Sequence, residues 1–361
     1  MPIAFFFRSW ALILVVAITA SAAPAMERVR VSDDHKRFVL DPSGQPFTPW
    51  GHNYASVDVL QRLDKDKARV ERDFADMKAA GTTVARVHPE MPMLMLGPTR
   101  MDPHGLDLLS QLLDIAQKTG IYLDLTGLAC YQINHRMAWY DALDEPARWN
   151  AQAFFWEGVA KACADSPAVF CYCLVNEPAP SGKASDAWYF GRMGDVEFCQ
   201  RLTLDPGTRT ADQIFDQWAA RMTAAIRKHD PHRPITLGML PFPGAYKGVS
   251  SRLDFVSPHL YPKTGKVEDE LKLLKQFDWG KPIVIEETFP LSCGVDDERQ
   301  FLLQSRGIAA GWIGHWPDQP PATLEQLQKT GKATLQDGIW LSWVNLFKQL
   351  GPQMTQPSSQ P

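Results

Sequence analysis

The chain has 361 residues, a formal net charge of −4, and a composition of 45% hydrophobic and 22% charged residues. A charge this close to zero on a chain of this length argues against nucleic acid or anionic lipid as a partner. The composition is that of an ordinary globular protein, so we expect a folded domain with a large core.

The N-terminal residues have the pattern of an export signal. Arg8 precedes an apolar run from Trp10 to Thr19, and the small residues Ala20–Ala23 follow. This order is typical of a cleaved signal peptide. The alternative is an uncleaved membrane anchor, but the run is shorter than the roughly 20 residues that cross a bilayer. We therefore expect a signal peptide over residues 1–22 and a secreted or periplasmic protein without membrane contact after cleavage.

A repeated strand–helix pattern follows this segment. Residues 37–47 alternate around a Pro-Ser-Gly turn, which predicts a small β-hairpin ahead of the main domain. Short apolar strands are predicted over residues 50–54, 83–88, 121–126, 168–175, 235–239, 255–259, 283–287 and 309–315. Amphipathic helices are predicted over residues 67–80, 106–119, 149–164, 211–229, 268–277, 297–306 and 338–350.

The number and order of these elements predict the fold class. Strands that alternate with helices form a parallel sheet, and eight such units favour a closed (β/α)8 TIM barrel over an open doubly wound sheet. No GxGxxG or Walker loop occurs in the sequence, so nucleotide binding is not indicated. We expect a single α/β barrel domain over residues 23–350 and a flexible, polar and Pro-rich tail over residues 351–361.

The six cysteines are compatible with disulfides in an exported chain, but their spacing assigns no pairs. Cys171 and Cys173 lie two apart on a predicted strand, so they share a face and are poorly placed to bond to each other. Cys199 and Cys293 are both expected on the upper face of the barrel, where they are one candidate pair. No Cys/His group has zinc spacing, so we expect neither a structural metal nor a cofactor.

Reactive side chains are expected where the predicted strands end, because active sites of such barrels lie at the C-terminal ends of the strands. The candidates are Arg86, His88, Asn176, Glu177, His259, Tyr261, Glu286, Glu287, Trp312, His315 and Trp316. Two carboxylates that face each other across the barrel mouth, supported by Arg, His, Tyr and Trp, are what glycoside cleavage requires.

Three segments carry a resemblance to a known family. Val175-Asn176-Glu177-Pro178 resembles the acid/base motif of clan A glycoside hydrolases, most closely family 5, which contains cellulases and mannanases. The segment from Lys281 to Glu287 is similar to the nucleophile strand of that family, and the segment from Ser257 to Pro262 is similar to the one that supplies its His and Tyr. The order of these segments and the positions of the strands also match the family, so the resemblance covers nearly the whole mature chain.

The resemblance implies a role for each matching residue. Glu177 would be the general acid and then the base, and Glu287 the nucleophile of a double displacement, with the carboxyl groups about 5–5.5 Å apart. Arg86 and Tyr261 would stabilise the charge of Glu287. Further expected roles are a 2-hydroxyl contact for Asn176, orientation of Tyr261 or Glu177 by His259, stacking on sugar by Trp316 rather than Trp312, and substrate contacts by Asn53 and His88. Glu177, Arg86, His259 and Tyr261 each also have a purely structural alternative.

The adjacent pair Glu286 and Glu287 needs a choice, because successive side chains on a strand point to opposite faces. Both faces of this strand are apolar, and the Lys-Pro spacing of the resemblance selects Glu287. Glu286 would then face the helices and need a buried partner.

The sequence departs from the family's pattern at the predicted strand 121–126. The family usually has a histidine at the end of this strand, and here there is none. His88 or His135 is a candidate substitute.

The expected function is a monomeric retaining hydrolase of a β-linked polysaccharide or oligosaccharide, with glucan or mannan as the first candidates. A transglycosylase on the same scaffold is the main alternative, since it shares the covalent intermediate. A barrel metallohydrolase is less well supported, because no His-x-His ends the first strand. The long segment 179–210 is expected to close one end of the cleft and to favour short substrates.

Overall fold

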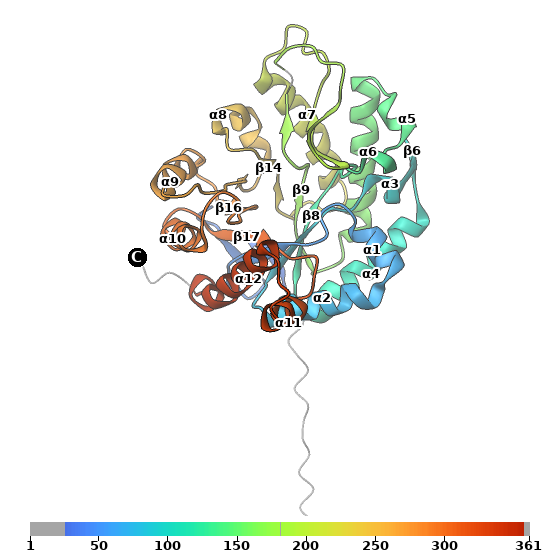
Figure 1. Ribbon diagram of the computed structural model, residues 1–361. Helices are drawn as coiled ribbons and strands as arrows, with labels where there is room; N and C mark the ends of the chain where they lie inside the picture. Colours follow the sequence, from blue (N-terminus) through green and yellow to red (C-terminus); the bar gives the residue numbers. More distant parts are fainter. Residues whose placement is uncertain (1–25, 181, 357–361) are drawn as a thin grey trace, which may run out of the picture.

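In the computed structural model, residues 26–180 and 182–356 are described; the predicted signal peptide lies outside them. A ring of parallel strands forms the centre of the molecule, and helices surround it (Figure 1). The main sheet has seven strands in the order β13 (Ile235–Thr236), β9 (Val169–Cys173), β8 (Tyr122–Thr126), β5 (Val84–Val87), β4 (Trp50–Asn53), β17 (Gly311–His315) and β16 (Val284–Ile285).

Two short strands close this sheet into a barrel. Strand β14 (Gly238–Met239) continues from β13 and pairs in parallel with β15 (Ser257–Pro258). Single parallel bridges then link the β15 segment to the β16 segment, namely Val256 to Ile283 and His259 to Glu287. The prediction of a (β/α)8 barrel is therefore confirmed, although the strands predicted over residues 255–259 and 283–287 are shorter and the one over 235–239 is divided in two.

Each of the seven predicted helices is present, within a few residues of its predicted bounds. They are α2 (Lys67–Ala79), α4 (Pro103–Thr119), α6 (Glu145–Cys163), α7 (Ala211–Arg227), α9 (Val267–Lys275), α10 (Val295–Ser305) and α12 (Leu335–Met354). Shorter helices that were not predicted are α1 (Val59–Lys65), α3 (Met91–Leu94), α5 (Ala138–Asp141), α8 (Pro243–Tyr246) and α11 (Pro321–Lys329). Local sequence fixes several ends: Thr210 and Gln213 form a capping box on α7, and Gly120 ends α4 in the left-handed conformation.

The end of the chain differs from the prediction of a flexible tail from residue 351. Helix α12 continues to Met354, and both Gly351 and Met354 are buried. Gly351 lies against the indole of Trp50, so the end of the helix is fixed by packing on the barrel. Residues 357–361 lie outside the described part of the chain. Among residues 26–180 and 182–356, no helix has the length and apolarity needed to cross a membrane.

The N-terminal residues form a small sheet that covers the floor of the barrel. The predicted hairpin is present as β2 (Phe38–Asp41) and β3 (Pro46–Phe47), and an additional strand, β1 (Arg28–Val31), pairs with β2. Phe38 is fully buried and contacts the edges of Phe170 and Phe255, two inward-facing rings of the barrel. The floor is therefore sealed by aromatic side chains.

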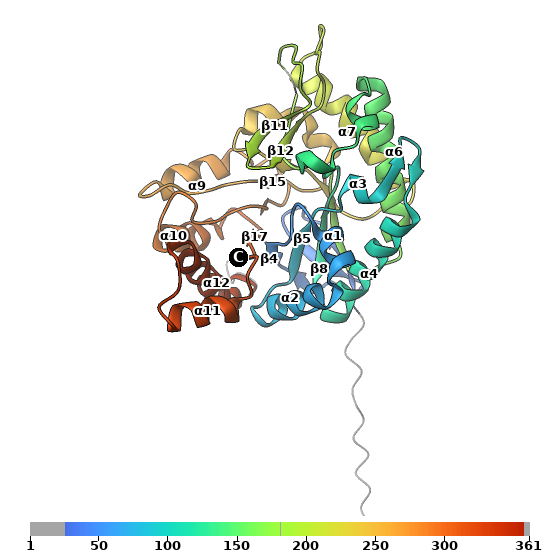
Figure 2. The same ribbon diagram turned by 45° about the vertical axis from the view of Figure 1, so that its right-hand side comes forward.

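Insertions extend the opposite end, the mouth of the barrel. After β9, the chain forms a three-stranded sheet of β10 (Pro178–Ala179), β12 (Val196–Arg201) and β11 (Tyr189–Met193). Figure 2 shows β11 and β12 beyond the ends of the barrel strands. A second, smaller ladder pairs β6 (Met95–Gly97) with β7 (Arg100–Met101), and 3-10 turns occur at Ile133–His135 and Lys247–Arg252. The long segment 179–210, for which no strand was predicted, thus contains most of its own small sheet.

Candidate active site

The candidate nucleophile Glu287 follows β16 and is held at both carboxylate oxygens. Arg86 Nη1 donates to Oε1 at 2.6 Å, and the Tyr261 hydroxyl donates to Oε2 at 2.6 Å. Burial alone would raise the pKa of Glu287, but the positive charges of His259 and Arg86 outweigh it and hold that pKa well below its usual range. Glu287 is therefore ionised, as a nucleophile must be.

The candidate acid Glu177 follows β9 on a strained backbone. Its φ is +44°, a backbone conformation that residues other than glycine rarely adopt. Its N–H donates to the Gly238 carbonyl at 3.0 Å. This turn directs the carboxyl group toward the barrel axis. There, His259 Nδ1 lies 2.8 Å from Oε1, and the Cys199 thiol donates to Oε2 at 3.3 Å.

The two glutamates converge on one histidine. One carboxylate oxygen of Glu177, one of Glu287 and a ring nitrogen of His259 all lie within 4.8 Å of one another. His259 Nδ1 is 2.8 Å from Glu177 and 3.5 Å from Glu287. Burial would lower the pKa of His259, but the charge of Glu287 and the hydrogen bonds with Glu177 and Glu286 raise it to about 9. The predicted partner of Glu177 is thus a charged histidine.

Arg86 is fully buried and is positioned by two asparagines. Asn53 Oδ1 accepts from Nη1 at 2.7 Å, and Asn176 Oδ1 accepts from Nη2 at 2.8 Å. The Asn53 amide also donates to the carbonyls of Glu286 and Gly314, while the Asn176 amide donates to Phe198. Both asparagines therefore fix the guanidinium group that holds Glu287. Their predicted contacts with substrate stay predictions.

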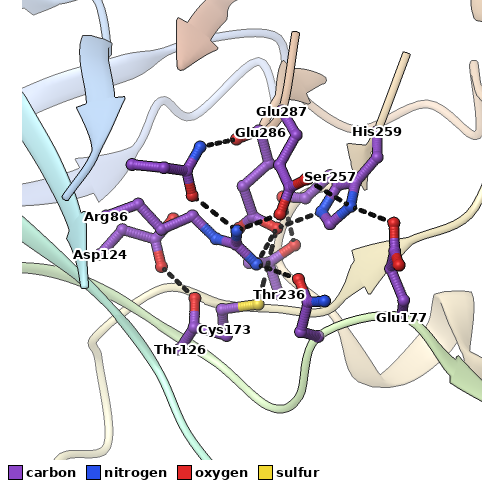
Figure 3. Close-up of polar contacts among 12 residues, drawn as sticks. Arg86, Asp124, Thr126, Cys173, Glu177, Thr236, Ser257, His259, Glu286 and Glu287 are labelled. Carbon is purple, nitrogen blue, oxygen red and sulfur yellow. Dashed lines mark hydrogen bonds and ion pairs between the residues drawn. The ribbon is translucent and has the colours of Figure 1, made fainter. Parts of the chain in front are cut away.

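Glu286 does not face the helices, so that prediction was wrong. Its side chain is fully buried inside the barrel, below Glu287 (Figure 3). Oε2 lies 3.3 Å from His259 Nε2 and 3.4 Å from Arg86 Nη2. The apolar residues of β16 alternate as expected, with Val284 in the barrel floor cluster and Ile285 in the cluster under the helices. Alternation continues to Glu286, and the strand then ends, which leaves Glu287 free to turn into the mouth.

The remaining predicted residues lie at different depths. Trp316 is nearly buried, with its ring edge-on to His52 at 4.9 Å, whereas Trp312 packs in the core and donates to the Ser305 hydroxyl. His88 is buried against Tyr131, and its ring nitrogens have no hydrogen-bond partner among the described residues. His135 is at the surface, bonded to Gln61, so it does not replace the missing histidine.

Sequence reasoning gave two members of the site no role in it. His315 was recognised only as a strand-end residue; its Nε2 lies 3.0 Å from the Tyr261 hydroxyl, and the two rings stack. Because Tyr261 donates its single proton to Glu287, His315 is the donor in this contact. Cys199, on β12 of the insertion, had no indication in the sequence of a contact with Glu177.

The candidate disulfide between Cys199 and Cys293 is absent, so that prediction was wrong. All six cysteines lie within residues 26–180 and 182–356, and all have free thiols. Cys199 is bonded to Glu177, and Cys293 contacts Glu298 at 3.8 Å instead. Cys171 and Cys173 share a face, as their spacing predicted, and this face points into the barrel: Cys171 belongs to the floor cluster, and Cys173 lies 3.6 Å from Glu286.

Two groups of side chains have the spacing of metal ligands. They are Asp124, Cys173 and Glu286, and Glu177, His259 and Glu287. Arg86 is 3.4 Å from Glu286 in the first group and 2.6 Å from Glu287 in the second. The guanidinium thus already supplies the cation that both groups require, and a metal ion would have to displace it.

A parallel (β/α)8 barrel with two converging glutamates at the carboxyl ends of its strands has the architecture of a glycoside hydrolase. Residues 40–277 match the family model described as cellulase, glycosyl hydrolase family 5. The chain belongs to glycosyl hydrolase family 5 and is an O-glycosyl hydrolase, which confirms the resemblance found in the sequence.

Solved structures with the same fold include several enzymes that act on mannosides. An exo-β-1,4-mannosidase from Opitutaceae bacterium strain TAV5 has a TM-score of 0.66 at 16% identity, with 90% of this chain and 62% of that chain covered. A β-mannanase from the blue mussel Mytilus edulis has a TM-score of 0.59 at 16% identity, with 91% and 97% covered. A mannosidase from Rhizomucor miehei has a TM-score of 0.57 at 14% identity, with 92% and 98% covered. These likenesses concern the fold, and no curated protein matches the sequence.

Proposed function

We propose that this protein is a retaining β-glycosidase that acts by double displacement, with Glu287 as nucleophile and Glu177 as acid and base. The observation that carries the proposal is the approach of the two carboxyl groups, which have oxygens within 4.8 Å of each other. Retaining enzymes place the two groups about 5–5.5 Å apart, whereas inverting enzymes leave roughly 6.5–9.5 Å for a water molecule.

The contacts of Glu287 support its role in the first step. Arg86 and Tyr261 hold both oxygens and keep the carboxylate ionised, so that one oxygen can attack the anomeric carbon. As that bond forms, Glu177 donates its proton to the leaving oxygen. The C–O bond to the leaving group breaks, and the sugar remains covalently attached to Glu287.

The second step reverses the role of Glu177. Now ionised, it accepts a proton from a water molecule, whose oxygen attacks the anomeric carbon and releases Glu287. His259, 2.8 Å from Glu177, holds the carboxyl group in place through both steps. Two inversions at one carbon give net retention of configuration.

We propose a short β-linked substrate, with β-1,4-mannosides tested first because neighbouring folds include mannosidases and mannanases. Glu177 is 6% exposed, and the sheet of β10, β11 and β12 lies above its side of the mouth. A site bordered on one side by an inserted sheet favours chain ends and oligosaccharides over the interior of a long polymer. Secretion after cleavage near residue 22 and a monomeric state are further proposals, which rest on the sequence alone.

The test is a substrate screen followed by product stereochemistry. Purified protein is incubated with mannan, cellulose, xylan and aryl β-glycosides, and the first anomer released is identified by proton NMR before mutarotation. We expect the β-anomer of a mannoside or glucoside. Initial release of the α-anomer would refute the retaining mechanism. Products longer than the substrate would instead indicate transglycosylation, which shares the same covalent intermediate.

A further inference from the structure

A third carboxylate lies beneath the two catalytic glutamates. Glu286 is fully buried, and its Oε2 faces both His259 Nε2 at 3.3 Å and Arg86 Nη2 at 3.4 Å (Figure 3). Gly238 closes the space beside it: a Cβ at this glycine would lie 2.9 Å from His259 Nε2 and 3.0 Å from Glu286 Oε2. The contact between Glu286 and His259 is therefore enclosed and direct.

His259 stands between two carboxyl groups, Glu177 on Nδ1 and Glu286 on Nε2. A neutral imidazole has one N–H and one lone pair, and a lone pair that faces a carboxylate oxygen is repelled. Two ionised carboxylates therefore require a doubly protonated ring. If the Nδ1 proton lies on Glu177 instead, the ring can be neutral, but only in the form that keeps its proton on Nε2, toward Glu286.

Asp124 on β8 shares the buried space with Glu286. Burial and the neighbouring charge of Glu286 raise the pKa of Asp124 well above its usual range, so Asp124 is neutral and its proton is available to Glu286. Burial would also raise the pKa of Glu286, but Arg86 and the hydrogen bond with His259 outweigh it and lower that pKa. The pair thus holds one proton and one negative charge, and the charge is on Glu286.

Resting on the retaining mechanism proposed above, we propose that Glu286 is a positioning residue for the acid step. It fixes a proton on Nε2 of His259 and leaves the Nδ1 N–H directed at the carboxyl group of Glu177. With Glu177 protonated, the cations Arg86 and His259 face the anions Glu286 and Glu287, and the buried cluster is neutral. Loss of the negative charge at position 286 would leave one uncompensated positive charge in the cluster. This positive charge disfavours protonation of the His259–Glu177 pair, so the pair would lose a proton at lower pH.

Other titratable groups also face this cluster, and none of them replaces the charge of Glu286. Those near His259, Glu177 and Glu286 on the surrounding elements are Cys171 and Cys173 on β9, Cys199 on β12, Tyr246 on α8, Tyr261 after β15, His315 on β17 and His88 after β5. Burial raises the pKa values of the thiols and phenols and lowers those of His88 and His315, so all seven are neutral at neutral pH.

The experiment compares Glu286→Gln with Asp124→Asn as a matched control. Both variants replace a buried carboxyl by an amide of the same shape, but only the first removes a negative charge. For Glu286→Gln, we expect the alkaline limb of the kcat/KM profile to move down by about one pH unit, since an opposite charge nearby shifts a titration by about 1–3 units. For Asp124→Asn, we expect the limb to stay within a few tenths of a unit.

Leaving-group dependence separates this role from a merely structural one. Glu286→Gln should slow substrates with poor leaving groups, which need the acid, more than aryl glycosides with good ones. Equal loss on all substrates with an unchanged pH profile would overturn the proposal and leave the retaining mechanism intact. A wild-type protein without glycosidase activity would instead refute the proposed function.

A readout independent of activity covers a Glu286→Gln variant that fails to fold. In wild-type protein labelled with ¹⁵N-histidine, the resonances absent from His259→Gln belong to His259. We expect both ring nitrogens to be protonated at pH 7 and, if the ring is titrated at higher pH, Nε2 to keep its proton. A neutral His259 ring protonated only on Nδ1 at pH 7 would overturn the proposal.

Discussion

The floor and the mouth of the barrel are built from the same strands, yet they differ in almost every chemical respect. On β5, Val84 faces the interior at the floor and Arg86 faces it one layer above. On the β15 segment, Phe255 lies at the floor and His259 at the mouth, two layers above. The spacing of two residues keeps these side chains on the same face, so that the layer alone decides their surroundings.

The difference separates stability from chemistry. At the floor, Phe38, Phe170 and Phe255 are fully buried in edge or tilted contacts, with ring centroids 5.0–5.4 Å apart. At the mouth, Arg86 and Glu286 are equally buried, and each depends on a charged partner to offset its desolvation. Substitutions at the floor should therefore change stability, and substitutions at the mouth should change activity.

The largest expected effect is on activity, at Glu287. Glu287→Ala should lower kcat on the order of 10⁴-fold or more, because the nucleophile is lost. Added azide should restore turnover and give a glycosyl azide of inverted configuration, which NMR identifies. The exposed Glu325, in α11, provides the control Glu325→Ala, with unchanged kcat. Full activity in Glu287→Ala would exclude this residue as nucleophile.

Glu177 should have the next largest effect, and that effect should depend on the substrate. Glu177→Ala should slow substrates with poor leaving groups roughly 10³-fold, since acid catalysis is lost. Aryl glycosides that depart without a proton should still form the covalent intermediate rapidly, seen as a burst in stopped-flow absorbance. A loss of equal size on both kinds of substrate would contradict the role of Glu177 as acid.

At the floor, Phe170→Ala should cost about 3–5 kcal/mol of unfolding free energy, as burial of a large ring is replaced by a cavity. Activity measured well below the melting temperature should remain near wild type. The 61% exposed Phe242 offers the same chemical change as a stability control, and Phe242→Ala should leave unfolding by urea almost unaltered. A catalytic defect in Phe170→Ala at full folding would show that floor and mouth are coupled.

The smallest expected effect concerns a carboxyl group of the mouth that has no cationic partner within the described part of the chain. Glu90 is 4% exposed; Oε2 accepts from Leu60 N–H, and Oε1 has no partner among the described residues. Burial raises its pKa to about 8. Because the folded pKa exceeds the unfolded one, stability present at low pH is lost as the pH rises through 8, on the order of 3 kcal/mol between pH 5 and pH 9. Urea unfolding of Glu90→Gln should lack this loss, whereas the exposed control Glu71→Gln should retain it.

The sequence predicted the barrel and the positions of most site residues because both depend on local order. Apolar strands between amphipathic helices specify a parallel sheet, and the ends of parallel strands meet at one edge. Arg86, Glu177, His259, Tyr261 and Glu287 were found in this way. The ends of α2 and α4 also depend on local sequence, because Gly81 and Gly120, which follow them, adopt positive φ.

Contacts between distant segments could not be predicted in this way. Cys199 reaches Glu177 from an inserted sheet whose pairing has no periodic pattern, and the assumed disulfide failed for the same reason. The orientation of Glu286 depends on where β16 ends, and strand ends are set by neighbouring strands rather than by the strand itself.

The amino-acid order alone therefore determined the fold class, the family and the two glutamates, since periodicity and short motifs are properties of neighbouring residues. Only the tertiary structure decided which glutamate of the pair 286–287 lies below the other, and which groups neutralise it. The physical reason is that burial and charge pairing are set by the closure of the barrel, which brings β5, β8, β9, β15 and β16 around one enclosed space.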